Sequence, residues 1–136
     1  MLLRSTEGRI YRSDSADYGE TWTHTYPTEL PNNSGIDLVQ SSEGILYLIY
    51  NPVESNWGPR TPISLAVSED DGKSWKKVQD LSNGEGEFSY PAIIADDDFL
   101  YITYTFKRQN IAFWKIKLLN GNDTYKWDKT VRLYYS

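Results

Sequence analysis

An eight-residue pattern, S-x-D-x-G-x-[ST]-W, occurs twice in the chain, beginning at Ser15 and at Ser68. In such a segment the aspartate can accept backbone N–H groups inside a tight turn, and the glycine can adopt the left-handed conformation that the reversal needs. The serine or threonine hydroxyl adds a hydrogen bond within the turn, and the tryptophan can pack the end of the hairpin onto a sheet. We therefore interpret both copies as structural hairpin elements. Their key positions are Ser15, Asp17, Gly19 and Trp22 in the first copy, and Ser68, Asp70, Gly72 and Trp75 in the second.

Short runs rich in Ile, Val, Tyr and Thr alternate along the chain with Gly, Asn, Asp and Pro, which is typical of β-strands joined by turns. No segment has a sustained apolar stripe at the helical period, so the sequence predicts no helix longer than one turn. The aromatic content of 15% also favours pleated sheets. The predicted strands are residues 9–13, 21–25, 36–41, 46–50, 63–68, 75–80, 90–95, 100–106, 111–118 and 130–135.

The segments between these strands are of two kinds. Tight turns are predicted at residues 42–44, 70–72 and 120–123, where Gly, Asn and Asp favour antiparallel hairpins. Longer connections are predicted at residues 26–35 and 51–62, which contain prolines that cannot donate to a strand ladder. Long loops on an all-β scaffold are where binding sites tend to lie. The acidic triplet at residues 96–98 is interpreted as an exposed turn rather than a calcium site.

Composition excludes several classes of function. The chain has no cysteine and only one histidine, His24, so a disulfide framework and a cluster of zinc-binding thiolates or histidines are excluded, and we expect no metal and no cofactor. Its net charge of −5 offers phosphates no general attraction, so nucleic acid is not an expected partner. No run of about 18 apolar residues is present, so we expect no membrane partner. The first residues also lack the apolar stretch of a secretory signal.

The two copies of the eight-residue pattern resemble Asp-boxes, also called BNR repeats, which recur in sialidases (neuraminidases) and related six-bladed β-propellers. This resemblance implies an all-β fold, a partial β-propeller of two to three four-stranded antiparallel blades with Asp-box hairpins. Asp-boxes of that family lie on the periphery of the blades, away from the catalytic centre. Six blades of about 50 residues need roughly 300 residues. We therefore expect residues 1–136 to form the C-terminal part of a single sialidase-like propeller domain.

The resemblance also implies a catalytic centre. In sialidases three arginines clamp the substrate carboxylate, a tyrosine assisted by a glutamate is the nucleophile, and an aspartate is the acid/base group. Arg60, at the head of the strand predicted at 63–68, resembles the third arginine, and Tyr90 resembles the nucleophile. Glu87 lies three residues before Tyr90 and is predicted to be its partner.

Two further residues are predicted to bind substrate. Arg4 resembles the second clamp arginine, although Arg9 and Arg12 are near enough in the sequence to compete with it. Trp57, in the long connection at 51–62, is a candidate for stacking on a sugar face.

The chemistry explains why these residue types suit an acidic sugar. Sialic acid carries its carboxylate on the anomeric carbon, so an anionic nucleophile would approach against a like charge, whereas a tyrosine is neutral until a base takes its proton. Sialidases accordingly use a tyrosine nucleophile, whereas most glycosidases use a pair of carboxyl groups. Guanidinium groups suit the clamp because they are planar, permanently charged and able to bind a carboxylate bidentately.

Two functions remain open at this point. The first is a sialidase-like glycoside hydrolase, in which the intact protein removes a terminal sialic acid or a similar acidic sugar. No residue of this chain matches the first clamp arginine, the acid/base aspartate or the assisting glutamate, which precede Arg4 in the family order. We therefore expect that this chain alone does not hydrolyse sialosides. The alternative is a non-catalytic, glycan-binding or self-assembling β-propeller module.

The expected partners follow from the same reasoning. A carbohydrate, either a sialoside or another acidic glycan, is the expected ligand. We also expect a homo-oligomer, because a partial propeller exposes apolar blade faces and an unpaired strand at 130–135. The sequence does not specify a compartment, and the resemblance is compatible with an intact protein that is secreted or periplasmic.

Overall fold

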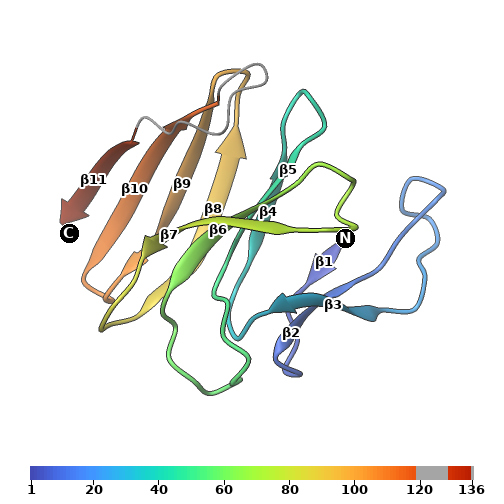
Figure 1. The fold of residues 1–136 in the computed structure, drawn as a ribbon, viewed down its shortest axis with the longest axis horizontal. Coiled ribbons are helices and arrows are strands. Elements are labelled where there is room, and N and C mark those ends of the chain that lie inside the picture. Colours follow the sequence, from blue (N-terminus) through green and yellow to red (C-terminus); the bar gives the residue numbers. More distant parts are fainter. Residues whose placement is uncertain (119–128, 136) are drawn as a thin grey trace.

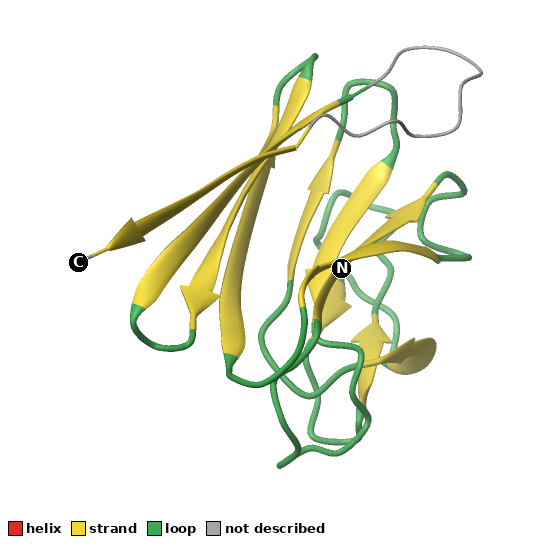
Figure 2. Ribbon diagram, turned by 60° about the vertical axis from the view of Figure 1, so that its left-hand side comes forward, coloured by secondary structure: helices red, strands yellow, loops and turns green. Residues whose placement is uncertain are grey.

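The computed structural model describes residues 1–118 and 129–135, and in these residues it contains eleven β-strands and no helix (Figures 1 and 2). They form three antiparallel sheets in which strands consecutive in the chain are neighbours. The all-β, partial β-propeller fold predicted from the sequence is confirmed. The predicted turn at residues 120–123 lies outside the described residues.

The three sheets follow one another across the molecule (Figure 1). The first has three strands, β1 (Leu2–Leu3), β2 (Arg9–Arg12) and β3 (Tyr26–Pro31). The second has four, β4 (Asp37–Gln40), β5 (Leu46–Tyr50), β6 (Ile63–Ser68) and β7 (Lys76–Ser82). The third also has four, β8 (Phe88–Ala95), β9 (Phe99–Phe106), β10 (Asn110–Lys117) and β11 (Lys129–Tyr135).

One predicted strand is wrong, and the first sheet shows why. Residues 21–25 complete a turn, because Thr21 donates its backbone N–H and its hydroxyl to Asp17 and because Thr23 donates its N–H to Asp14. The strand β3 lies instead in the region predicted to be a connection. It tolerates Pro27 and Pro31 because it is at the edge of its sheet, where a missing N–H breaks no inner ladder.

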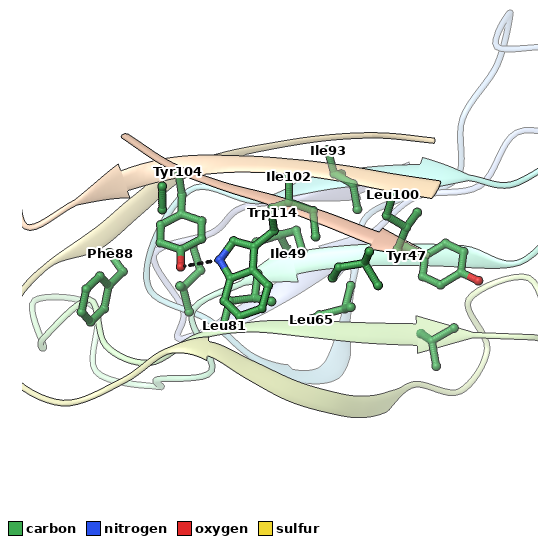
Figure 3. Close-up of a cluster of buried hydrophobic side chains, with 14 residues drawn as sticks. Tyr47, Ile49, Leu65, Leu81, Phe88, Ile93, Leu100, Ile102, Tyr104 and Trp114 are labelled. Carbon is green, nitrogen blue, oxygen red and sulfur yellow. Dashed lines mark hydrogen bonds between the residues drawn. The ribbon is translucent and has the colours of Figure 1, made fainter. Parts of the chain in front are cut away.

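The second sheet forms the centre of the core and is buried on both faces. Every residue of β6 is buried, and side chains along β5 alternate between two hydrophobic clusters. Tyr47 and Ile49 face the third sheet, where Figure 3 shows them with Trp114 and Tyr104, whereas Leu48 belongs to the cluster shared with the first sheet. This double burial explains why β5 and β6 are nearly continuous apolar runs rather than alternating ones.

The two eight-residue repeats form the β2–β3 and β6–β7 turns with nearly identical hydrogen bonds. In the second, Oδ1 of Asp70 accepts the backbone N–H of Ser74 at 2.9 Å, and Oγ of Ser68 accepts the N–H of Gly72 at 2.9 Å. The first repeat has the equivalent bonds, from Thr21 to Asp17 and from Gly19 to Ser15, each at 2.8 Å. Both glycines have left-handed backbone angles, with φ of 90° and 75°.

The tryptophans of the two repeats differ in their environments. Trp75 is partly buried and packs against the cluster between the first two sheets, whereas Trp22 is exposed and donates its indole N–H to the carbonyl of Gly19. Arg12 ties the two turns together, because it binds Asp14 beside the first repeat and the carbonyl of Asp71 in the second. The Arg12 side chain therefore connects the first and second sheets at this end of the strands.

The first prediction concerns the pH dependence of stability. The pKa of Asp70 is lowered to about 2 from 3.8, first because the Ser74 hydroxyl donates to it and then because the Ser74 N–H does. The unfolded chain therefore binds more protons between these values, so the stabilisation is complete above pH 4 and is lost as the pH falls toward 2. We expect Asp70→Asn to make the free energy of unfolding less dependent on pH between 2 and 4, as measured by urea unfolding.

The matched control is Asp97→Asn, which removes one carboxylate from the exposed turn between β8 and β9. The loss of pH dependence in Asp70→Asn should be larger than any change in Asp97→Asn. If the free energy of unfolding depends equally on pH in Asp70→Asn and in the wild type, the Asp70 hydrogen bonds do not stabilise the folded state.

Candidate functional site

Three loops and the segment before β8 surround a hollow of about 340 Å³. The loops are the β1–β2, β5–β6 and β9–β10 connections, which come from all three sheets. Because the β5–β6 loop enters β6 and the second Asp-box leaves it, the hollow and the Asp-box lie at opposite ends of that strand. The hollow is lined by Arg4, Thr6, Asn56, Trp57, Gly58, Pro59, Arg60, Glu87 and Arg108.

A carboxylate bridges two arginines in the wall of the hollow. Oε1 of Glu87 accepts a hydrogen bond from Nη1 of Arg60 at 3.0 Å, and Oε2 accepts one from Nε of Arg108 at 2.6 Å. The Ser89 hydroxyl donates to the same Oε1, and the N–H of Phe88 donates to the carbonyl of Arg60. The pKa of Glu87 is lowered, chiefly because Arg108 donates to its ionised form, with burial acting in the opposite direction. Glu87 thus fixes both guanidinium groups from the start of β8.

Tyr90 does not line the hollow, but it lies beside Arg60 and is held in an unusual backbone conformation. Its ring centroid is 5.6 Å from Cζ of Arg60, and its side chain is 65% exposed. Its φ of 55° is left-handed, and a bulge interrupts the pairing of β8 with β9 between Ser89 and Ala92. A bulge re-aims a side chain, and strain at a non-glycine residue is commonly found at functional sites.

The remaining candidates separate according to whether they line the hollow. Arg4 lines it, is exposed, and has no ion-pair partner among the described residues. Trp57 also lines it and is 95% exposed. The competing Arg9 pairs with Glu54, and Arg12 is committed to the Asp-box turns, so neither lines the hollow.

A buried asparagine holds the loop that carries Trp57 and Arg60. Asn33 follows the last strand of the first sheet. Its side-chain Nδ2 donates hydrogen bonds to the carbonyls of Ser55, Gly58 and Pro59, at 3.0–3.3 Å. These carbonyls belong to a loop without strand partners, so the amide replaces the ladder that the loop lacks. The shape of this wall of the hollow therefore depends on a residue from a neighbouring sheet.

A second buried asparagine joins the three sheets. Nδ2 of Asn51 donates to the carbonyls of Pro62 and Phe88, both at 2.9 Å, and the backbone N–H of Asn51 donates to the side chain of Asn32. Asn51 follows β5, Phe88 begins β8, and Asn32 follows β3. This network places the starting points of the site loops relative to one another.

Sequence reasoning missed Arg108, Asn33 and Asn51. Arg108 lies in a β9–β10 hairpin turn, where a polar residue usually signals only solvent exposure. The signals that could have found the asparagines are their positions in the two long connections, where Asn33 follows Pro31 by two residues and Asn51 directly precedes Pro52, and where backbone carbonyls need donors.

The charges of the hollow favour an anionic ligand. Three guanidinium groups face one carboxylate there, although the chain as a whole has a net charge of −5. Guanidinium groups bind carboxylates and other oxyanions through paired hydrogen bonds. Among the described residues, no group of three or more His, Asp or Glu side chains could hold a metal ion.

A comparison with protein families identifies the class of the chain. A family model described as a BNR repeat-like domain matches residues 1–102, so the chain belongs to this family, whose repeat occurs in sialidase-type β-propeller proteins. No curated protein matches the chain. In the described part of the chain there is no helix that could span a membrane.

The second prediction tests the network that joins the sheets. Asn51→Ala leaves the carbonyls of Pro62 and Phe88 without their amide donor, so we expect the free energy of unfolding to fall by about 2–3 kcal/mol. Asn83→Ala, in an exposed turn, is the control and should change it by less than about 0.5 kcal/mol. Urea unfolding measures both. Equal effects of the two substitutions would contradict the joining role of Asn51.

The third prediction tests the carboxylate bridge. Because Arg108 is the main cause of the lowered pKa of Glu87, Arg108→Gln should raise that pKa toward its ordinary value of 4.5. Carboxyl ¹³C NMR titration of Glu87 measures the shift. Lys107→Gln removes the neighbouring positive charge in the same turn and is the matched control. A larger shift in the control than in Arg108→Gln would show that general charge, rather than the Arg108 hydrogen bond, holds Glu87 ionised.

Proposed function

We propose that the intact protein is a sialidase-like glycoside hydrolase that removes a terminal sialic acid or a similar acidic sugar. The observation that carries this proposal is the position of the Arg60 guanidinium, 5.6 Å from the Tyr90 ring centroid, beside a hollow with an excess of positive charge. Membership of the BNR repeat-like family supports the same class of protein.

Each residue has a role in this proposal. Arg4 and Arg60 bind the carboxylate of the sugar. Tyr90 loses its proton to a base and attacks the anomeric carbon, while the glycosidic bond breaks and the leaving alcohol takes a proton from an acid; water then cleaves the bond between Tyr90 and the sugar. The acid and the base are groups of the intact protein that no residue of this chain matches. Arg60 and Tyr90 are close enough to act on a single sugar ring, because Cζ of Arg60 is 5.6 Å from the Tyr90 ring centroid. Glu87 is a positioning residue, because its carboxylate already accepts hydrogen bonds from Arg60, Arg108 and Ser89.

The alternative proposal is a non-catalytic, glycan-binding module. It is supported by Trp57, whose side chain is 95% exposed although it borders the hollow. An exposed aromatic face next to polar groups is suited to stacking on a sugar ring. The two proposals share a ligand class and differ in whether Tyr90 reacts.

The fourth prediction separates these proposals. In the protein expressed from its natural reading frame, Tyr90→Phe should lower kcat for a fluorogenic sialoside by about 1,000-fold or more, because the nucleophilic oxygen is removed. Arg60→Ala should raise KM as well as lower kcat, since the ground-state carboxylate also loses a partner.

The control is Asp70→Ala, at the opposite end of β6 from the hollow. It should lower the thermal midpoint and leave turnover per folded molecule near the wild-type value. Sialoside binding without hydrolysis by the wild-type protein would support the binding module instead. Equal turnover by Tyr90→Phe and the wild type would exclude Tyr90 as the nucleophile.

A further inference from the structure

Two guanidinium groups in the hollow retain hydrogen-bonding edges that no described residue occupies. Arg108 uses only Nε to bind Glu87, so its Nη1 and Nη2 atoms have no partner in the described part of the chain. Arg60 uses only Nη1, so its Nε and Nη2 atoms are equally uncommitted among the described residues. Each guanidinium can therefore still bind one oxyanion through two parallel hydrogen bonds.

Arg108 is held in place rather than merely exposed. Its hairpin is anchored to the segment before β8 twice, by the Glu87 side chain and by the N–H of Lys107, which donates to the Glu87 carbonyl at 2.7 Å. Lys107 and Arg108 both have left-handed φ angles, 55° and 54°, which are unfavourable for residues other than glycine. Such strain persists where the surrounding contacts fix the conformation.

The hollow has enough positive charge to bind a second anion. Glu87 compensates one of the three guanidinium groups, and the carboxylate of a terminal acidic sugar would compensate another. One positive charge would then remain. Arg108 is the candidate for it, because its side chain lines the hollow and is nevertheless 70% exposed, within reach of a ligand that extends into solvent.

We infer that Arg108 is a specificity-determining residue that binds a second carboxylate, on the sugar next to the terminal acidic sugar. The preferred ligands would then be glycans in which two acidic sugars are adjacent. This inference rests on the proposed function, since it assumes that the terminal acidic sugar occupies the hollow. It assigns to Arg108 a contact with the ligand, separate from its contact with Glu87.

The experiment compares two oligosaccharides that differ in one acidic sugar. The first is sialyllactose, and the second is the same molecule extended by one α2,8-linked sialic acid. Their Kd values are measured by calorimetry with the protein from the natural reading frame, in a Tyr90→Phe background so that neither ligand is consumed. The variants are Arg108→Gln, Arg108→Lys and the control Lys107→Gln, which changes the charge of the same turn outside the hollow.

The expected result is that Arg108 variants lose the preference for the ligand with two acidic sugars. The background protein should prefer the ligand with two acidic sugars by about tenfold or more, as one charge-assisted bidentate pair provides. Arg108→Gln should reduce this preference to about twofold, because it weakens binding of the ligand with two acidic sugars more than binding of sialyllactose. Arg108→Lys should retain part of the preference, because it keeps the charge but not the paired donors. Lys107→Gln should retain all of it.

Other outcomes overturn the inference in distinguishable ways. If Arg108→Gln weakens both ligands equally, Arg108 acts only through Glu87 and Arg60, and the proposed function stands. If the background protein binds both ligands equally well, there is no second subsite, and the proposed function again stands. If neither ligand binds, the proposed function and this inference fail together.

Discussion

The buried side-chain amides of Asn33 and Asn51 are the interactions on which the arrangement of the three sheets and the site depends. Each sheet is an antiparallel ladder, and the hydrogen bonds within a ladder do not position one sheet against the next. Apolar packing between sheets supplies most of the driving force for burial, but it is not directional. The amides add direction, because Asn51 bonds at once to Pro62 and to Phe88 of the next sheet, and Asn33 holds the loop that carries Arg60.

Glu87 extends this positional control from the backbone to the charged groups. A hollow containing only guanidinium groups would suffer repulsion among them, and their long side chains would lose considerable entropy on being fixed. A single carboxylate reduces both problems, since it bridges Arg60 and Arg108 and is itself fixed by Ser89. The arginines are thereby arranged before a ligand arrives, which lowers the cost of binding. Tyr90 shares this framework, because the bulge that aims it follows Ser89 directly.

The parts of the fold that were predictable from the sequence are those determined by local patterns. The strands β5 and β6 agree with their predicted bounds because continuous apolar runs end at turn residues. Residues 21–25 were wrongly assigned because their backbone groups bond to Asp14 and Asp17, a competition that strand propensity does not contain. Arg4 and Arg60 were found through a family resemblance, Trp57 through its place in a long loop and Glu87 through its spacing to Tyr90. These four residues line one hollow, and Tyr90 lies beside Arg60 without lining it. Arg108, Asn33 and Asn51 were missed because their partners are distant in the sequence, and only the packing of sheets brings them together.

The net negative charge of the chain and the positive charge of the hollow affect an anionic ligand at different distances. At physiological ionic strength the Debye length is about 8 Å, so a ligand some distance from the protein responds to the summed charge of the surface, and one at the rim responds to the nearby arginines. A long polyanion would span both regions, and much of its length would lie against a repulsive surface. A short acidic ligand would contact the attractive region alone. The same arginines therefore favour small anions over polymers without any steric filter, and added salt should narrow that difference by weakening the long-range repulsion first.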